Sequence, residues 1–316
     1  MKIAYVSNTR FPWCTESEVT TALRRRGHEV VNVQEDKATR GEFLAAATSS
    51  DLVWWTRTWN RLVTLDHLAQ LRDLGIPTVA LHADLYLGLS REPQMAGDPF
   101  WAVDHCFTAD GDPACQERFR EMGITHHWLP PAVDDDACYI ADIPYEHDLV
   151  FIGSWRSYHP EYQYRQQLVQ WLSKSYGRRF EVWGPQGKGM VRGDDLNRLS
   201  AGSKIIIGDS LCLDFKHKNY WSDRIPNVLG RGGFMIHPYI DGLERFYKLD
   251  GPDIELVTYG YGNFKQLADL IDHYYRNDAQ REAIRQRGFE RTKQNSTWSV
   301  RIEEMFYVLR AEGAIS

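Results

Sequence analysis

Short apolar runs alternate with helix-like segments along the first half of the chain. The runs that predict strands are Lys2–Ser7, Glu29–Val33, Leu52–Thr56 and Thr78–Leu81. Between the first two runs, Glu16–Arg26 places its apolar residues at helical spacing, and Gly27 follows as a stop signal. Strands that alternate with helices indicate a parallel sheet with crossover helices on its faces.

The second half repeats this alternation without repeating the sequence. Its predicted strands are Leu149–Ile152, Phe180–Trp183, Lys204–Gly208 and Phe234–His237. Its predicted helices are Tyr162–Ser175, Asp194–Leu199, Ser222–Gly230 and Phe264–Arg276. The last segment, Trp298–Arg310, has apolar residues along one side, so we expect a C-terminal helix that packs back on the first domain.

The alternation breaks at Leu129–Val133 and resumes at His147. We interpret Asp134–Asp136, which lies between them, as a solvated turn rather than a metal site. The pattern predicts an α/β protein with two Rossmann-like domains whose parallel sheets face each other across a cleft. The domains cover residues 1–140 and 147–297, and residues 298–316 form the returning helix. Ligands of such sheets bind at the carboxyl ends of the strands.

The composition is that of a globular protein that carries neither a metal nor a membrane anchor. Of 316 residues, 43% are hydrophobic and 25% charged, and no apolar run approaches the roughly 20 residues that span a bilayer. Five scattered cysteines form no CxxC, and His126-His127 have no acidic partner at ligand spacing. We therefore expect a cytoplasmic protein with no bound metal, no cofactor and no membrane partner.

Two nucleotide-binding classes lose support because their phosphate loops are missing. The chain contains neither GxGxxG between a strand and a helix nor GxxxxGK[ST], which disfavours a dehydrogenase and a P-loop NTPase.

Charge is distributed unevenly between the two halves of the chain. Residues 1–145 hold 13 Lys and Arg against 21 Asp and Glu, a balance of −8, and residues 146–316 hold 24 against 22, a balance of +2. The second half suits a diphosphate ligand, and the acidic first half weighs against binding a nucleic-acid backbone.

The segment Asn219–Phe234 carries the strongest candidate chemistry. Ser222 is predicted as the N-cap of a helix, with Asp223 in its first turn. A helix start presents free N–H groups to an anion, and Arg224 there has the geometry to bind phosphate oxygens. The alternative is that Arg224 pairs with Asp209 or Asp214 as a structural bridge. The spacing alone leaves both interpretations open.

This segment, together with several others, resembles the CgeB-like glycosyltransferases of the GT-B fold. The resemblance is carried by Tyr220–Phe234, Met1–Glu16, His82–Tyr86, Phe107–Gly111, Val150–Ser154 and Ile207–Ser210. These blocks occur in the order found in versions that phages of actinobacteria carry. The resemblance implies that the second domain binds a nucleotide-diphosphate sugar as co-substrate and that the first domain binds the acceptor. A phage-encoded protein would work in the host cytoplasm.

The resemblance also assigns roles to individual residues. It implies that Arg224 is catalytic and that the donor is bound by Asn8, Gly153, Ser154, Arg156, Gly184, Val191, Asp209, Ser222, Asp223 and Asn227. Arg156 and Arg224 would contact the diphosphate, and Val191 the nucleobase. Asn227 stands where many retaining relatives have a glutamate that holds the ribose. An amide accepts hydrogen bonds less strongly than a carboxylate, which puts donor affinity and donor identity in question.

In the first domain, the resemblance favours His82 and Asp84 as further catalytic residues. From its position alone, a structural histidine is the favoured interpretation of His82 at a strand end. The aromatic and basic residues Trp13, Arg57 and Trp59 are predicted to bind the acceptor, by stacking on a sugar or a base.

The leading hypothesis is sugar transfer to a hydroxyl with retention of configuration. The acceptor is a 5-hydroxymethylpyrimidine in phage DNA, or alternatively a virion or cell-envelope component. A non-catalytic sugar-nucleotide-binding protein and a nucleotide-sugar epimerase are the competing interpretations.

Overall fold

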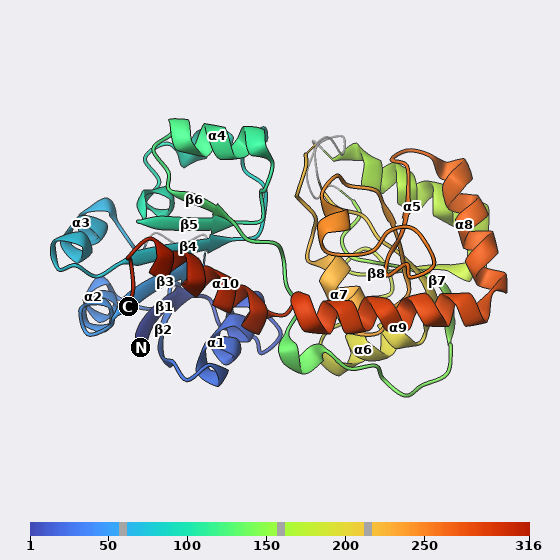
Figure 1. Cartoon of the computed structure of the whole chain (residues 1–316), viewed down its shortest axis with the longest axis horizontal. Coiled ribbons are helices and arrows are strands. Elements are labelled where there is room, and N and C mark those ends of the chain that lie inside the picture. The colour runs from blue at the N-terminus through green and yellow to red at the C-terminus, as the bar shows by residue number, and fades with distance from the viewer. Residues whose placement is uncertain (57–61, 157–161, 212–216) are drawn as a thin grey trace. The chain divides into compact units, whose positions relative to one another are not determined.

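The computed structural model describes residues 1–56, 62–156, 162–211 and 217–316. The chain forms two compact units (Figure 1). Unit 1 comprises Met1–Pro130 and Trp298–Ser316, and unit 2 comprises Pro131–Thr297. The prediction of two α/β domains with parallel sheets is confirmed. None of the helices in the described ranges combines the length and the apolar character that crossing a membrane requires.

Unit 1 is built on a parallel six-stranded sheet in the order β2-β1-β3-β4-β5-β6. The strands are β1 (Lys2–Ser7), β2 (Glu29–Gln34), β3 (Leu52–Thr56), β4 (Thr78–His82), β5 (His105–Thr108) and β6 (His126–Trp128). The helices are α1 (Thr15–Arg25), α2 (Arg40–Thr48), α3 (Leu65–Asp73), α4 (Pro113–Glu121), η1 (Glu92–Met95), η2 (Pro99–Ala102) and α10 (Trp298–Ala311). Strands β1, β3 and β4 are buried almost throughout, as expected for a parallel sheet covered on both faces.

Helix α10 brings the end of the chain back onto unit 1, where it crosses the strands (Figure 1). It packs against α1, and Trp298 Nε1 donates a hydrogen bond of 3.1 Å to Glu18 Oε2. Further along, the ring of Phe306 lies 6.3 Å from that of Trp54 in β3, measured between centroids. The amphipathic face of α10 therefore completes the core of unit 1.

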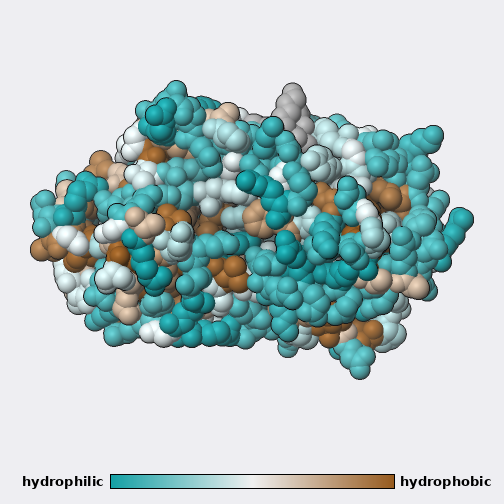
Figure 2. Space-filling view, in the orientation of Figure 1, coloured by the Kyte–Doolittle hydropathy of each residue, from teal (hydrophilic) through white to brown (hydrophobic). Residues whose placement is uncertain are grey.

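Unit 2 has a parallel five-stranded sheet in the order β11-β10-β9-β7-β8. The strands are β7 (His147–Ile152), β8 (Phe180–Trp183), β9 (Ser203–Ile207), β10 (Met235–Pro238) and β11 (Val257–Tyr259). The helices are α5 (Gln163–Tyr176), α6 (Gly193–Ala201), α7 (Arg224–Gly230), α8 (Phe264–Arg276), α9 (Asp278–Asn295), η3 (Asp135–Ala137), η4 (Gly177–Arg179) and η6 (Leu243–Arg245). The outward face of α9 is mostly hydrophilic (Figure 2).

The strand orders fix where each unit can bind a ligand. In unit 2 the chain runs from β7 to β8 on one side and then crosses back to β9 on the other side of β7. In unit 1 the same reversal separates β1 from β3. At such a reversal, the connections after neighbouring strands leave in opposite directions and open a crevice at the carboxyl ends. The candidate sites are therefore the described parts of the loops after β7, β9 and β1, and residues 57–61, which follow β3, lie outside the described residues.

Candidate functional site

Two glycines bring the loops after β7 and β8 into close contact. Gly153 has φ of +141° and Gly184 has φ of +143°, a region that other residues rarely adopt. A Cβ on Gly184 would lie 2.5 Å from the carbonyl oxygen of Gly153, and a Cβ on Gly153 would lie 2.6 Å from Arg224 Nη2. Glycine is thus required at both positions for the arginine to reach the end of β7.

Arg224, the first residue of α7, lies across the carboxyl ends of β7 and β9. Its Nε donates to the carbonyl oxygen of Ile152 at 2.8 Å, and Nη1 donates to the carbonyl oxygen of Asp209. The guanidinium also lies over the ring of Phe151, 5.2 Å from its centroid. These contacts hold the cation at the strand-order reversal of unit 2. They are made to main-chain oxygens and not to the Asp209 carboxylate, and Asp214 lies outside the described residues.

The carboxylate of Asp209 is instead bound by Arg165 of α5, which sequence reasoning missed. Arg165 Nε donates to Asp209 Oδ2 at 2.6 Å, and Nη1 donates to the carbonyl oxygen of Ser154 at 3.0 Å. The side chains of Arg165 and Asp209 are 6% and 1% exposed. A signal was present, because Arg165 falls on the same helical face as Leu168 and Leu172 of α5. A buried arginine needs an anionic partner, which here positions the loop after β7.

The prediction of Ser222 as the N-cap is wrong. Helix α7 begins at Arg224, and Asp223 holds the N-cap position without a side-chain cap. The Ser222 hydroxyl donates to the carbonyl oxygen of Asp209 at 3.3 Å, and its backbone N–H donates to Ser210 Oγ at 3.0 Å. Contacts to the loop after β9 therefore replace the local cap.

Asn227 Nδ2 donates to the carbonyl oxygen of Asp223 at 3.0 Å, so this amide folds back on the turn that precedes it.

The remaining donor residues of the prediction lie on the loops after β7 and β8. Arg156 is exposed and stacks on the Trp155 indole, 4.3 Å from the ring centroid. Trp155 Nε1 donates to the carbonyl oxygen of Gln186 at 3.3 Å, which joins the two loops. Val191 is buried shortly before α6. The structure thus brings Gly153, Ser154, Gly184, Asp209, Ser222 and Arg224 together, and Arg156 borders them.

His237, at the end of β10, is a further site residue that sequence reasoning missed. Its Nε2 lies 3.1 Å from Ser210 Oγ, and its Nδ1 lies 2.6 Å from the carbonyl oxygen of Pro238. Burial lowers the pKa of His237 to about 4, so the imidazole is neutral near pH 7. It acts there as a neutral hydrogen-bonding support for the loop after β9.

We expect His237 to make the protein less stable as pH falls from about 6.5 to 4. Its folded pKa of about 4 lies below the ordinary value of 6.5, so the unfolded chain binds the proton first. Over this window its contribution is lost at about 1.4 kcal/mol per pH unit. Urea unfolding at several pH values should show a shallower slope for His237→Gln. The exposed control His273→Gln should keep the wild-type slope, and equal slopes in His237→Gln and wild type would contradict this assignment.

The predicted residues of unit 1 fall into two environments. Asn8 lies just after β1 at the strand-order reversal, and its Oδ1 accepts a hydrogen bond from Gln34 Nε2. His82 is buried, with Tyr86, Phe100 and Trp101 ring centroids at 4.9, 5.9 and 6.1 Å. Asp84 is exposed on the loop that follows. The aromatic surroundings of His82 are those of a packed histidine at the edge of the core.

An exposed aromatic pair lies on the loop after β1. Phe11 and Trp13 stack with their centroids 5.4 Å apart and their planes at 14°, and the two residues are 53% and 47% exposed. Trp13 was predicted to bind the acceptor, whereas Phe11 was missed. Exposed, pre-stacked rings at a strand-order reversal are suited to stacking on a planar ligand. Arg57 and Trp59, the other predicted acceptor residues, lie outside the described residues.

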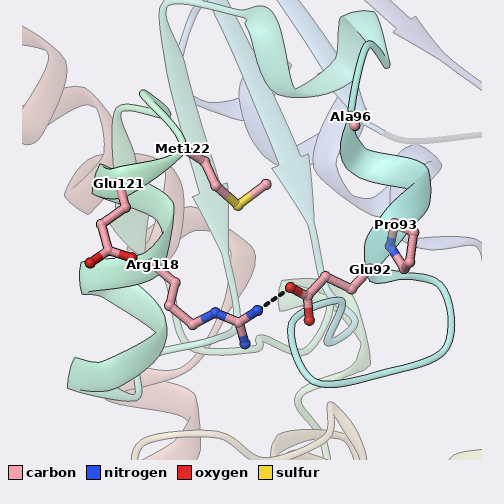
Figure 3. A pocket seen from close by; sticks show the side chains of 6 residues that line it. All are labelled: Glu92, Pro93, Ala96, Arg118, Glu121 and Met122. Atoms are coloured by element: carbon pink, nitrogen blue, oxygen red, sulfur yellow. Dashed lines mark hydrogen bonds and ion pairs between the residues drawn. The ribbon is translucent and has the colours of Figure 1, made fainter.

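A separate hollow of about 380 Å³ lies in unit 1 between η1 and α4 (Figure 3). Its lining residues are Glu92, Pro93, Ala96, Arg118, Glu121 and Met122. An ion pair between Arg118 and Glu92 crosses it (Figure 3). The hollow contains no residue of the predicted site, and its only lining cation is already paired with Glu92. Its lining residues therefore present no unpaired cation to a phosphorylated ligand.

Comparisons with known proteins concern the fold and the family. The model of the family described as Glycosyl transferase-like matches residues 163–306, which include Arg165, Asp209 and Arg224. Comparison with curated protein sequences gives no significant match. Among solved structures, an alpha-glucosyltransferase in complex with UDP and a 13-mer DNA containing a HMU base aligns with a TM-score of 0.68 at 11% identity. That alignment covers 98% of this chain and 99% of the other.

Two other solved structures align over similar lengths. Sucrose-phosphate synthase from Thermosynechococcus elongatus gives a TM-score of 0.64 at 12% identity and covers both chains completely. HepE from Anabaena in complex with UDP-glucose gives 0.61 at 12% identity, covering 98% of this chain and 100% of that one. The chain has the GT-B fold of these structures, and the fold together with the family match over most of unit 2 supports a glycosyltransferase.

Proposed function

We propose that the protein transfers a sugar from a nucleotide-diphosphate sugar held by unit 2 to a hydroxyl of an acceptor held by unit 1. The observation that carries the proposal is the position of Arg224. Its guanidinium is fixed by two main-chain carbonyls at the carboxyl ends of β7 and β9, beside the Gly153 turn. A cation held rigidly at that point stabilises the negative charge that builds on a departing diphosphate.

In this proposal the donor is a uridine diphosphate sugar bound by the loops of unit 2. Support comes from the structural neighbours that contain UDP or UDP-glucose. Arg224 and the exposed Arg156 contact the diphosphate, and the segment around Val191 contacts the base. Asn227 and Asp223 are placed near the ribose, although the amide of Asn227 is engaged with the preceding turn. Its oxygen accepts hydrogen bonds less strongly than a glutamate carboxylate would, which would weaken donor binding.

We propose that transfer proceeds with retention, with a departing phosphate oxygen assisting the incoming hydroxyl. The Asp209 carboxylate is held by Arg165, and His237 is neutral and buried, so neither is arranged to serve as a nucleophile. A mechanism that relies on the leaving group needs a fixed cation more than a protein base. Nuclear magnetic resonance of the product's anomeric proton would decide: an α-linkage from an α-linked donor supports retention, and a β-linkage contradicts it.

The acceptor we propose is a 5-hydroxymethylpyrimidine in DNA. Support comes from the solved alpha-glucosyltransferase whose DNA contains a HMU base, and from the exposed Phe11–Trp13 pair. This specificity would accord with the affiliation we propose, a CgeB-like enzyme of an actinobacterial phage. The −8 balance of residues 1–145 opposes it, and a virion or cell-envelope glycan is the alternative acceptor.

The test is to incubate the protein with hydroxymethylated or unmodified DNA and a panel of nucleotide sugars, and to digest the DNA for nucleoside mass spectrometry. A hexose-sized mass increase confined to the hydroxymethylated nucleoside is the expected result. No increase with any donor would overturn the DNA acceptor. Thermal-shift measurements with the same nucleotides separate the outcomes, because binding stabilises the folded state. Stabilisation without donor hydrolysis or transfer would favour the non-catalytic interpretation, and sugar conversion without an acceptor would favour an epimerase.

Removing the exposed aromatic ring should weaken acceptor use without affecting the donor. Base stacking is worth about 1–3 kcal/mol, so Trp13→Ala is expected to raise KM for the acceptor by about 5- to 150-fold. The KM for the donor should stay unchanged, because Trp13 belongs to unit 1. Tyr307→Ala, which removes a 72% exposed ring on α10, serves as the control. An unchanged acceptor KM in Trp13→Ala would remove this residue from the acceptor site.

A further inference from the structure

Two histidines and a glutamate meet on one face of unit 1. They are far apart in the sequence, so no short ligand motif predicts the group. The side chains are His105 from β5, His127 from β6, and Glu312 just after α10. Their side chains are 11%, 14% and 42% exposed. The acidic partner that the sequence lacked near His126-His127 is therefore supplied by the end of the chain.

Strand register explains why these residues share a face. His105 pairs with Val79 of β4, and Val79 pairs with Trp54 of β3, whose ring contacts Phe306 of α10. His127 pairs with Phe107, two residues after His105, so both imidazoles project from the face that α10 covers. Glu312 then closes the group, because its backbone N–H still bonds to the last turn of α10.

We propose that His105, His127 and Glu312 bind a divalent transition-metal ion of the zinc type. The three ligand atoms form a triangle. His105 Nδ1 lies 3.2 Å from His127 Nε2 and 3.2 Å from Glu312 Oε2, and His127 Nε2 lies 3.7 Å from the same oxygen. Ligand atoms around a tetrahedral zinc ion lie about 3.3–3.6 Å apart, given bonds of about 2.0–2.2 Å. The Glu312 side chain is 42% exposed, so the group is accessible from the solvent.

His105 Nδ1 is within hydrogen-bonding range of both other atoms, and each of the three atoms carries a lone pair when it is unprotonated. A cation at the centre interacts favourably with a lone pair on each of the three atoms. Two imidazoles with one carboxylate suit zinc, nickel or copper, whereas magnesium and calcium prefer all-oxygen ligands. The site begins at the amino end of β5, so the ion would fasten the chain end to the sheet.

The test uses the full chain, stripped with a chelator and titrated with ZnCl2 by calorimetry at pH 7.5. Wild-type protein should bind one zinc ion per chain and melt at a higher temperature with zinc, and MgCl2 should do neither. His127→Gln and Glu312→Gln are each expected to weaken zinc binding at least about tenfold. His273→Gln, an exposed histidine on α8, is the matched control and should bind zinc like the wild type.

Glu312 is partly exposed and follows the last helix, so Glu312→Gln removes a ligand without disturbing the core. Zinc binding that is equal in wild type and both variants would overturn the site. So would the absence of one-to-one binding by wild-type protein. These readouts do not depend on sugar transfer, so failure here leaves the proposed function standing.

Discussion

Replacing Arg224 with lysine is expected to lower kcat/KM for sugar transfer about 100- to 1,000-fold. Lysine keeps the charge, but its one nitrogen carries three N–H donors where the guanidinium carries five on three nitrogens, so it cannot reproduce the bonds to Ile152 and Asp209 from separate atoms and bind a phosphate bidentately. If Arg224 acts mainly as the diphosphate leaves, the loss should appear chiefly in kcat, since an interaction made in the transition state lowers kcat and kcat/KM together.

The matched control is Arg276→Lys, an exposed arginine in the last turn of α8. It should leave both kinetic constants unchanged, which excludes a general effect of arginine loss. Thermal unfolding of Arg224→Lys separates a catalytic from a structural role, because the guanidinium also joins two strand ends. An Arg224→Lys protein with wild-type kcat would contradict the role proposed for this residue.

The largest stability effect is expected from Arg165→Met, which removes the partner of a buried carboxylate. Asp209 would stay in place with its charge uncompensated, and breaking a buried ion pair costs about 3–5 kcal/mol in the free energy of unfolding. Loss of the bond to the Ser154 carbonyl should also loosen the loop after β7. Urea unfolding followed by tryptophan fluorescence and circular dichroism would measure this effect, with separate transitions fitted if the units unfold independently.

Arg276→Met serves as the surface control and should change the free energy of unfolding by less than about 0.5 kcal/mol. A double variant, Arg165→Met with Asp209→Asn, removes both charges and should recover part of the loss. If Arg165→Met alone were as stable as wild type, the ion pair would not be the support of the loop that the geometry indicates.

The central strands could be predicted from the sequence because a strand of a parallel sheet that is covered on both faces consists of a run of apolar residues. Strands β1, β3, β7 and β9 were predicted with at most small shifts at their ends. Helix α9 could not be predicted this way. Its 18 residues are mostly polar, and three of its five buried residues, Arg281, Gly288 and Thr292, are not apolar, so the buried side of the helix gives no hydrophobic periodicity.

The candidate site was predicted in part, for a related reason. Arg224 was found from its place at a predicted helix start, whereas Gly153 was assigned through the family resemblance. Arg165 and His237 were missed because their roles come from partners on other strands. Ser222 was wrongly assigned as a cap because the loop after β9 offers it better partners than the helix does. The preference of serine for an N-cap position is overridden when tertiary hydrogen bonds compete for its side chain.

The return of α10 to unit 1 has a consequence for the order of synthesis. Unit 2 is one continuous stretch, whereas unit 1 is assembled from two stretches separated by the whole of unit 2. On the ribosome, unit 2 is synthesised completely before the helix that covers Trp54 is made. Until that helix is made, the nascent first unit has an uncovered apolar sheet face. This face exposes the unit to aggregation and to chaperone binding during synthesis.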